Sequence, residues 1–340
     1  MRIPRRPALL VASLAAALAL PTLAACGGDD KPKVVVYNAQ HEELIVEVAA
    51  AFEEKTGVEV ELRSGKDLEL ANQIVAEGEA SPADVFLTEN SPAMRVVDKA
   101  GLFTKLDQAT LDRIPEQYRP ADGHWTGFAA RSTALVYHTS AVTPAELPTS
   151  ILDLAKPEWK GRITFSPTGA DFQAVVAAVL ALEGEAATSA WLDGLRANRG
   201  FDSSNNLVVM KAVNDGQADI GIFYHYYWYR DQEEAKENSG NTQLLILGNQ
   251  DPGAFLSTSG AGVLTNGDHP KEAQQFVDFL TSAEGQEVIA DSYALEYTLN
   301  PDAPLTREVK PLAELDPPGV STDDLDADAV IDLMQDAGLL

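Results

Sequence analysis

The run at residues 223–230, Phe-Tyr-His-Tyr-Tyr-Trp-Tyr-Arg, concentrates potential ligand atoms in one place. It holds four tyrosines and one histidine in eight residues, although only 7% of the 340-residue chain is aromatic. Phenol oxygens so concentrated suggest a binding site, whereas most tyrosines serve packing with the hydroxyl satisfied at the surface. The run by itself fits either a binding site or a buried aromatic strand end.

The tyrosines follow a short apolar segment at residues 218–222, which comes after Asp215 and Gly216 and predicts a buried strand. In open α/β sheets, ligands bind beyond the carboxyl ends of the strands. The position of the tyrosines therefore favours a binding site but does not identify its ligand.

Two further polar side chains follow predicted strands. His41 lies between a β-rich run at residues 34–37 and a helical pattern at residues 42–55, so it occupies a strand-to-helix turn. Glu89 comes soon after another predicted strand, at residues 82–87. Both side chains are therefore expected at the same kind of position as the tyrosines.

Together with the adjacent phenols of Tyr226 and Tyr227, His41 and Glu89 form an oxygen-rich set of donors. Such a set suits a hard cation, whereas zinc or copper would call for more imidazole or thiolate. A phenol with an ordinary pKa of about 10 loses its proton at neutral pH only beside a strongly polarising ion. Ferric iron is the natural candidate, since one carboxylate and two phenolates would balance its charge.

Enzyme motifs are incomplete in this sequence. His41, Glu42 and Glu43 resemble the start of a zinc-peptidase helix, but Ile45 stands where a second histidine is required. No Gly-x-Ser-x-Gly motif marks a nucleophilic serine. The acidic run at residues 324–328 lacks the glycine and the closing glutamate of an EF-hand loop, so a helix start explains it better. Four histidines without spaced partners are expected to be surface or packing residues: His124, His138, His225 and His269.

Strand and helix patterns alternate from residue 34 to residue 87, which predicts a parallel sheet with right-handed crossovers. Two β-rich runs at residues 125–131 and 133–137 adjoin one another and predict a strand that passes from one lobe to another. A small-residue segment at 254–264 is expected to form the return crossing. Further helices are predicted at residues 67–77, 172–182, 191–199, 270–280, 282–290 and 324–337.

Residues 166–170, Ser-Pro-Thr-Gly-Ala, precede the helix predicted at 172–182. Backbone N–H groups in such a turn can cradle an anion at the helix N-terminus. Turns of this composition are common before helices and mostly structural, so the motif alone is a weak signal.

The length of 340 residues exceeds one ordinary hydrophobic core and predicts two lobes, and a hydrophobic content of 45% can fill both.

Residues 1–25 combine three arginines, a short apolar stretch and small residues, which is typical of a signal peptide. The sequence Leu-Ala-Ala-Cys at 23–26 resembles a bacterial lipobox, in which Cys26 would be lipidated. The alternative is an incidental free thiol. Residues 26–33 would then tether the domain to the membrane.

The chain is strongly acidic, with 25 Lys and Arg residues against 52 Asp and Glu residues. Removal of the leader would take away three arginines and leave a formal charge of −30 on the mature part. Such a surface repels nucleic acid and anionic lipid head groups, which argues against both as partners. Solubility is the simpler explanation of the charge itself.

These motifs resemble those of bacterial ferric-ion-binding proteins, the iron-delivering components of ABC importers. The resemblance extends over nearly all of the mature chain and depends on the histidine, glutamate and paired-tyrosine motifs in combination. The matching stretches are residues 36–41, 82–89, 226–229, 250–254 and 276–280.

The resemblance implies an α/β, two-lobed type II periplasmic-binding-protein fold with parallel or mixed sheets and crossing hinge strands. One lobe would comprise residues 34–131 and 255–304, and the other residues 132–254 and 305–340. Iron would be bound by His41 and Glu89 from the first lobe and by Tyr226 and Tyr227 from the second.

The resemblance also implies a synergistic anion such as phosphate or carbonate. The positions that match the family's anion-binding residues are Asn90, Thr168, Gly169, Ala170 and Asn206. The family more often has Gln at position 90, Ser at 168 and asparagines at 224 and 225. Tyr224 could therefore replace the anion as a third phenolate.

The expected function is that of an extracytoplasmic lipoprotein, anchored to the outer face of the cell membrane, that captures Fe(III). It would deliver the ion to an ABC permease and its ATPase, as a monomer and not as an enzyme. One alternative within this fold is a protein that binds an oxyanion or an organic iron chelate. An alternative from another class is a metal-dependent hydrolase, which would show turnover.

Overall fold

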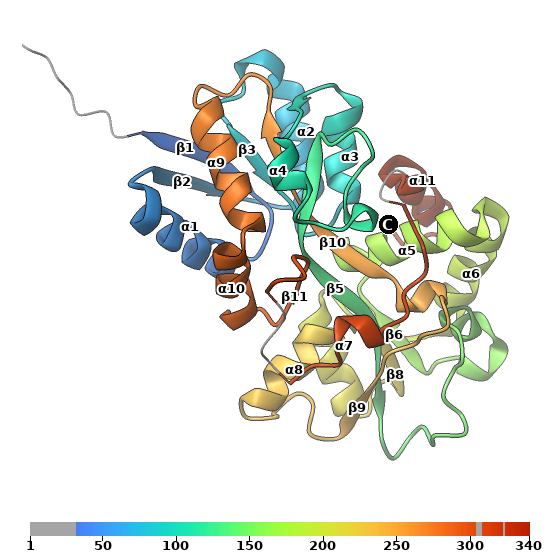
Figure 1. The fold of residues 1–340 in the computed structure, drawn as a ribbon. Helices are drawn as coiled ribbons and strands as arrows, with labels where there is room; N and C mark the ends of the chain where they lie inside the picture. The colour runs from blue at the N-terminus through green and yellow to red at the C-terminus, as the bar shows by residue number, and fades with distance from the viewer. Residues whose placement is uncertain (1–31, 304–307, 322–323) are drawn as a thin grey trace, which may run out of the picture. The chain divides into compact units, whose positions relative to one another are not determined.

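The computed structural model describes residues 32–303, 308–321 and 324–340 (Figure 1). The chain divides into a unit at Met1–Asp30 and a unit at Lys31–Leu340, and the second unit carries every element below. The predicted signal peptide, Cys26 and most of the predicted tether lie outside the described residues.

The first elements alternate as the sequence predicts. They are β1 (Lys33–Asn38), α1 (Glu42–Thr56), β2 (Glu59–Ser64), α2 (Asp67–Glu77) and β3 (Val85–Leu87). The strands lie in the order β2-β1-β3 and pair in parallel. The carboxyl ends of β1 and β3 therefore meet at one edge of the sheet, where His41 and Glu89 follow them.

Helices cover both faces of this sheet, because successive side chains of a strand point to opposite sides. Val34 and Val36 pack in a core with α1, α9 (Pro270–Thr281) and β10 (Leu256–Leu264). Val35 and Tyr37 instead pack with α2 and α3 (Pro92–Lys99). Figure 1 shows α1, α9 and α10 (Ala283–Asp291) together on one side of the sheet.

One long strand, β5 (Trp125–His138), belongs to both halves of the sheet system (Figure 1). Its first part pairs antiparallel with β10 and with β11 (Tyr297–Thr298). Its second part pairs with β8 (Ile220–Tyr224) and β9 (Thr242–Leu245). The two β-rich runs predicted at 125–131 and 133–137 are thus one continuous strand.

The second half of the sheet adds β6 (Ile163–Phe165), which pairs in parallel with β7 (Arg199–Asp202) and with β8. Arg199 therefore begins a strand and does not end the predicted helix at 191–199, which instead closes at Asn198. The division into two lobes at the boundaries given above stays a prediction.

Three of the four helices of this half contribute to a second large core, and the third along the chain packs in a separate cluster. The first helix agrees with its predicted range to within two residues, and the second begins six residues before its predicted start. The third and fourth were not predicted as helices, the fourth because its aromatic run resembles the end of a strand. The helices are α5 (Ala170–Glu183), α6 (Glu185–Asn198), α7 (Asn206–Asn214) and α8 (His225–Glu233).

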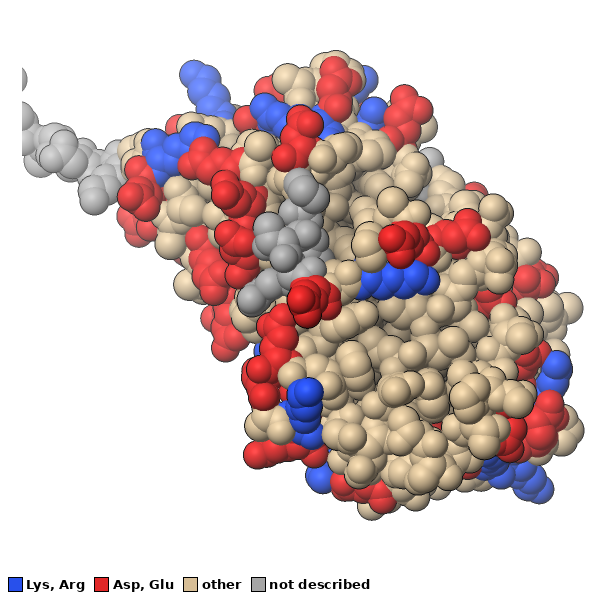
Figure 2. All heavy atoms as spheres, turned by 60° about the horizontal axis from the view of Figure 1, so that its bottom comes forward, with Lys and Arg blue, Asp and Glu red and all other residues tan. Residues whose placement is uncertain are grey.

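The remaining elements are shorter or lie near the C-terminus. They are β4 (Phe103–Thr104), α4 (Gln108–Leu111), α10 (Ala283–Asp291) and α11 (Ala327–Asp336), with 3₁₀ turns at Gly78–Ala80, Glu116–Tyr118, Ile151–Ala155, Pro157–Trp159, Pro252–Ala254 and Leu312–Glu314. Among the described residues, no helix combines the length and apolar character needed to span a membrane. Figure 2 shows acidic side chains spread over the face that it presents, with fewer basic ones between them.

Candidate metal centre

His41 lies at the turn between β1 and α1 and immediately precedes the helix. The turn is held by Asn38, whose side chain accepts from the backbone N–H of Gln40 and donates to its carbonyl, both at 3.0 Å. The Gln40 side-chain oxygen accepts from the N–H of His41 at 2.7 Å. These local bonds hold the turn in which the His41 imidazole faces Tyr226 and Glu89.

Glu89 is held by the carboxylate of Asp67, the first residue of α2. Asp67 accepts the backbone N–H groups of Glu89 at 2.8 Å and of Asn90 at 3.0 Å. Burial and the neighbouring charge of Glu89 raise the pKa of Asp67 to about 7. The backbone of the loop after β3 is therefore fixed, and the Glu89 side chain extends from it.

Tyr226 and Tyr227 lie in the first turn of α8, directly beyond the end of β8. His225 anchors this turn: its Nδ1 accepts from the N–H of Ser132 at 3.2 Å, and its Nε2 donates to the carbonyl of Leu295 at 3.1 Å. The rings of Tyr226 and Tyr227 stack with centroids 4.1 Å apart. The helix start thus presents two phenols side by side.

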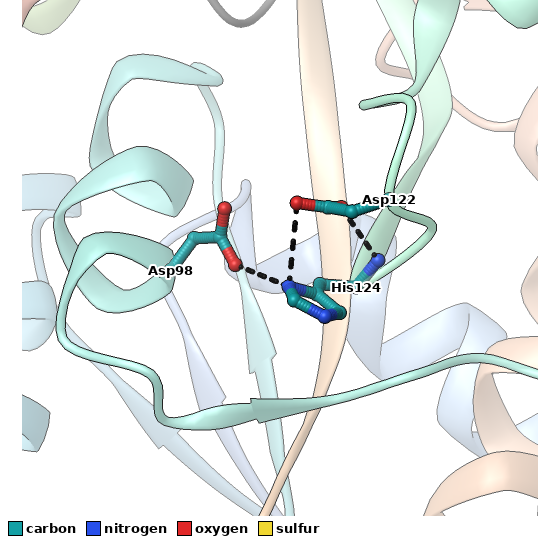
Figure 3. Close-up of side chains that lie close together, drawn as sticks. All are labelled: Asp98, Asp122 and His124. Atoms are coloured by element: carbon teal, nitrogen blue, oxygen red, sulfur yellow. Dashed lines mark hydrogen bonds and ion pairs between the residues drawn. The ribbon is translucent and has the colours of Figure 1, made fainter.

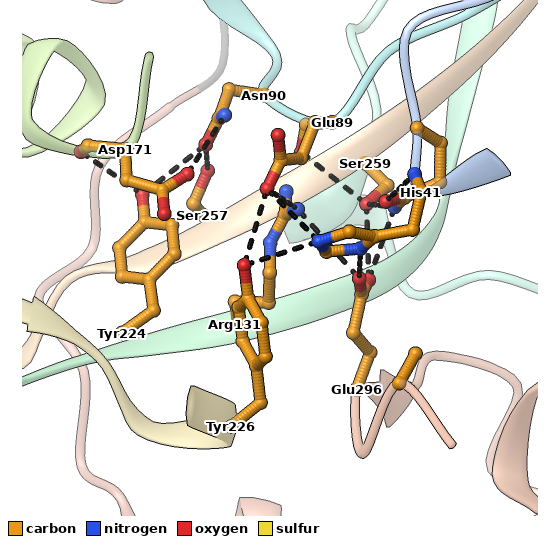
Figure 4. Close-up of polar contacts among 12 residues, drawn as sticks. His41, Glu89, Asn90, Arg131, Asp171, Tyr224, Tyr226, Ser257, Ser259 and Glu296 are labelled. Atoms are coloured by element: carbon orange, nitrogen blue, oxygen red, sulfur yellow. Dashed lines mark hydrogen bonds and ion pairs between the residues drawn. The ribbon is translucent and has the colours of Figure 1, made fainter. Parts of the chain in front are cut away.

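Three of the four predicted ligands converge (Figure 4). The Tyr226 hydroxyl lies 3.2 Å from His41 Nε2 and 3.5 Å from Glu89 Oε1, and these two atoms are 3.8 Å apart. Tyr227 stacks on Tyr226 and lines a cleft of about 480 Å³ together with Glu89. Residues far apart in sequence therefore form one group of nitrogen and oxygen donors.

The electrostatics of this group disfavour ionised phenols in the absence of a cation. Burial, the Tyr227 phenol and nearby carboxylates raise the pKa of Tyr226 well above its usual value. Burial and the charges of Asp171 and Glu89 likewise raise the pKa of Tyr227. A cation bound here would reverse the effect, because it favours the charged form of every neighbouring oxygen.

The predicted anion-binding asparagines contact a carboxylate of the chain itself. Asn206 Nδ2 donates to Asp171 Oδ2 at 2.5 Å, and Asn90 Nδ2 lies 3.4 Å from Asp171 Oδ1. Asp171 is buried, and burial and the charge of Glu89 raise its pKa well above the usual value. Thr168, Gly169 and Ala170 line the same cleft as this carboxylate.

Tyr224, the possible third phenolate, is fully buried at the end of β8. Its hydroxyl donates to Asn90 Oδ1 at 3.2 Å or to the backbone carbonyl of Asp171 at 3.3 Å. Ser257 also donates to Asn90 Oδ1, at 2.6 Å. In this arrangement the Tyr224 hydroxyl supports the asparagine and the loop around Asp171.

Arg131 lies beneath the centre, at the point where β5 passes from one half of the sheet to the other. Its side chain is fully buried, and Nη1 is 2.9 Å from Glu89 Oε1 and 3.7 Å from Glu296 Oε1. Its Nε and Nη2 atoms meet no hydrogen-bond acceptor in the described part of the chain. The guanidinium therefore acts mainly as a buried positive charge among carboxylates.

Comparison with known proteins assigns this chain to a protein family. Residues 80–315, more than half of the sequence, match a protein family described as "Bacterial extracellular solute-binding protein". The chain belongs to this family. Members of such a family bind a solute outside the cytoplasm, which agrees with the extracytoplasmic location expected from the sequence.

Several relatives of this solute-binding protein are named for iron. It is 50% identical over 331 residues to the Fe(3+)-binding periplasmic protein of Serratia marcescens, with 97% of each chain covered. It is 38% identical over 323 residues to the major ferric iron-binding protein of Neisseria gonorrhoeae, with 94% of each covered. The resemblance seen in the motifs is thereby confirmed.

The fold of this solute-binding protein is also that of solved relatives. Iron-bound HitA from Pseudomonas aeruginosa superimposes with a TM-score of 0.84 at 40% identity, over 91% of this chain and 100% of that one. Apo FutA2 from Synechocystis superimposes with a TM-score of 0.80 at 27% identity, over 91% and 100% of the chains. The predicted α/β fold of the type II periplasmic-binding-protein class is confirmed.

Three charged residues of this solute-binding protein were missed by sequence reasoning: Asp171, Arg131 and Glu296. Asp171 directly follows the predicted cradle at 166–170, which was a usable signal. Arg131 interrupts a long apolar strand, and a charge within such a pattern indicates a buried polar partner. Nothing in the local sequence distinguishes Glu296, because its partners come from distant segments.

The histidines outside the centre have partners that the sequence did not reveal. His124 Nδ1 lies 2.8 Å from Asp98 Oδ1 and 3.4 Å from Asp122 Oδ2 (Figure 3). The three ligand atoms lie within 4.8 Å of one another, a spacing that also suits a metal ion. The hydrogen bond between the imidazole and Asp98 accounts for the arrangement, which is partly exposed and separate from the centre described above.

Proposed function

We propose that this solute-binding protein captures Fe(III) through His41 Nε2, a Glu89 oxygen and the phenolate oxygens of Tyr226 and Tyr227. The observation that carries the proposal is the convergence of the first three side chains within 3.2 to 3.8 Å of one another. They come from separate turns after β1 and β3 and from the start of α8. The names of the relatives support the same cargo.

The charge of the centre favours a trivalent cation. Glu89 and two phenolates carry three negative charges, which match those of a ferric ion. The raised pKa values of Tyr226 and Tyr227 mean that these phenols stay protonated until a strongly polarising ion arrives. Iron capture is therefore accompanied by proton release, and affinity falls in acid.

Asp171 supplies the anionic group that the family resemblance assigned to phosphate or carbonate. The asparagines at 90 and 206, which would otherwise donate to an exogenous anion, donate to its carboxylate. The buried guanidinium of Arg131 offsets part of this additional negative charge. Such compensation lowers the cost of burying several charges together.

The family assignment supports a role in delivering the bound ion. Extracellular solute-binding proteins serve importers, and we propose that this one hands iron to an ABC permease driven by its ATPase, without catalysing a reaction. Acylation of Cys26 would keep it at the outer face of the cell membrane. The protein would act as a monomer, because every proposed ligand comes from one chain.

The test is a titration of the iron-free protein with ferric nitrilotriacetate, followed by metal analysis and visible spectroscopy. Phenolate-to-Fe(III) charge transfer absorbs visible light, so one equivalent of iron should produce a coloured protein. A colourless ferric complex, or a protein that takes up no iron, would contradict the proposed function.

A further inference from the structure

Glu296 is a fully buried carboxylate in the loop that precedes β11. Its Oε1 lies 3.0 Å from Nδ1 of His41, and the other ring nitrogen, Nε2, faces Tyr226 and Glu89. Figure 4 shows the His41 ring between these two sets of partners. Glu296 thus contacts the ring nitrogen that does not face the proposed iron position.

Gln40 decides which partner donates in the contact between His41 and Glu296. The backbone N–H of His41 donates to Gln40 Oε1, so Gln40 Nε2 must be the donor that meets Glu296 Oε2 at 3.1 Å. Arg131, which can only donate, faces the other oxygen of Glu296 at 3.7 Å. The neighbouring guanidinium charge favours the ionised form of Glu296, which can only accept, so His41 Nδ1 carries the hydrogen.

This assignment determines the chemistry of the second ring nitrogen. A neutral imidazole has one N–H and one lone pair, and a hydrogen bond at one nitrogen fixes the role of the other. With the hydrogen held on Nδ1, the lone pair of His41 is on Nε2 and is directed at Tyr226 and Glu89. Carboxylates that accept from a metal-binding histidine commonly orient the ring in this way.

We propose that Glu296 is a positioning residue for iron capture, which holds His41 in the Nδ1-protonated tautomer and so presents Nε2 to the ferric ion. The inference rests on the proposed function. It adds Glu296 to the residues that serve iron capture, although Glu296 would not itself touch the metal.

A purely structural role for Glu296, as the counter-charge of Arg131, fits the distances less well. Arg131 Nη1 is 2.9 Å from Glu89 but 3.7 Å from Glu296, whereas Glu296 is 3.0 Å from His41. The nearest charged or titratable partner of Glu296 is therefore the histidine.

The chain offers a matched control for the loss of a buried carboxylate. Asp84 is fully buried, and its Oδ2 lies 3.0 Å from Nδ1 of His269, at the start of α9 and outside the centre. Asp84→Asn therefore removes a buried carboxylate that lies at the same distance from a histidine Nδ1. The effect of this variant measures how much stability is lost when a buried carboxylate is removed, without a change at His41.

The first measurement uses the iron-free protein, labelled at histidine with the heavy nitrogen isotope. NMR at a pH where the rings are neutral distinguishes the protonated from the unprotonated ring nitrogen, and His41→Gln identifies the His41 signals. We expect Nδ1–H for His41 in the wild type and in Asp84→Asn. In Glu296→Ala we expect a shift toward Nε2–H, while Glu296→Gln, which keeps an acceptor oxygen, should retain the wild-type form in part.

The second measurement is ferric-ion affinity by competition with nitrilotriacetate. Loss of a residue that orients a metal ligand typically lowers affinity about 10- to 100-fold, so Glu296→Ala should fall in this range and Glu296→Gln at its weaker end. Asp84→Asn should bind iron as the wild type does, even if its unfolding temperature falls. The conservative Glu296→Gln variant keeps the test valid if Glu296→Ala does not fold.

The proposal fails if wild-type His41 carries its hydrogen on Nε2. It also fails if a folded Glu296 variant lacking the carboxylate keeps both the wild-type tautomer and the wild-type affinity. A wild-type protein that binds no ferric ion would contradict the proposed function instead. The tautomer measured without iron would still decide whether Glu296 orients His41.

Discussion

The hydroxyl of Tyr226 lies 3.2 Å from Nε2 of His41, although 185 residues separate them in the sequence. Tyr226 lies in the first turn of the helix after β8, and His41 follows β1, in the other half of the sheet system. A ferric ion bound between the two would hold these halves together. It can stabilise the closed arrangement only to the extent that it binds that arrangement better than an open one.

The phenols can be tested by removing their oxygens. Tyr226→Phe and Tyr227→Phe keep the stacked rings, so the iron-free proteins should change in stability by only about 1 kcal/mol. Each should weaken the visible charge-transfer band and iron binding, and acidification should bleach the wild-type band. Visible titrations and thermal unfolding measure both effects.

Tyr137→Phe is the control for these variants, because its hydroxyl also makes a hydrogen bond, to Gln243 at 2.9 Å, away from the centre. It should bind iron as the wild type does. If the double variant of Tyr226 and Tyr227 did so too, the assignment of the phenolate ligands would be wrong.

If Asp171 takes the place of the synergistic anion, iron affinity should not depend on added anions. The wild type should bind ferric ion equally with or without phosphate or carbonate, because the carboxylate already occupies the two asparagines. Asp171→Asn should bind more weakly and should regain affinity when either anion is added. Affinity measured in anion-free buffer and in buffers with each anion provides the comparison, and a wild type that requires phosphate would refute the role given to Asp171.

His225 predicts a loss of stability in mild acid. Burial removes the solvation of the charged ring and lowers the pKa of His225 to about 4, from an ordinary value of 6.5. The unfolded chain therefore binds a proton that the folded protein excludes between these values, and stability falls as pH drops through this window. The shift corresponds to about 3 kcal/mol when the pH reaches the folded pKa.

Denaturant unfolding of the wild type and of His225→Gln between pH 7 and about pH 4 checks this prediction. Other groups, including Asp67 with its raised pKa, titrate in both proteins and cancel in the comparison. The variant should be less stable at neutral pH and should lose less stability in acid. Parallel curves would show that His225 does not titrate as expected.

If Cys26 is lipidated, the protein is attached to the membrane. Cys26→Ala should leave the folded domain unchanged, since β1 begins only at Lys33, but it should release the protein from the membrane fraction. Cell fractionation and mass spectrometry of the mature N-terminus measure the two outcomes. A wild type that is soluble and carries no lipid would rule out the anchor.

The sequence by itself determined the elements and the turns that carry the ligands. Alternating apolar residues and helix stop signals are local, so they predicted α1 with His41 before it and β3 followed by Glu89. The same local reasoning predicted the strand that ends in the tyrosine run. It placed Tyr226 and Tyr227 beyond the end of that strand but did not predict the helix that begins there, because aromatic residues favour strands and the helix start at His225 is held by contacts with Ser132 and Leu295.

Only the tertiary structure decided what surrounds the ligands. Glu296 meets His41 across 255 residues, and Asp171 meets Asn90 across 81. No periodic pattern encodes such pairs, because they depend on how β5 joins the two halves of the sheet and on which loops meet above it. Burial then changes how these charged groups behave. On an isolated helix or strand, the carboxyl of Asp171 and the guanidinium of Arg131 would be ordinary surface charges. In the folded protein both are buried in one charged centre.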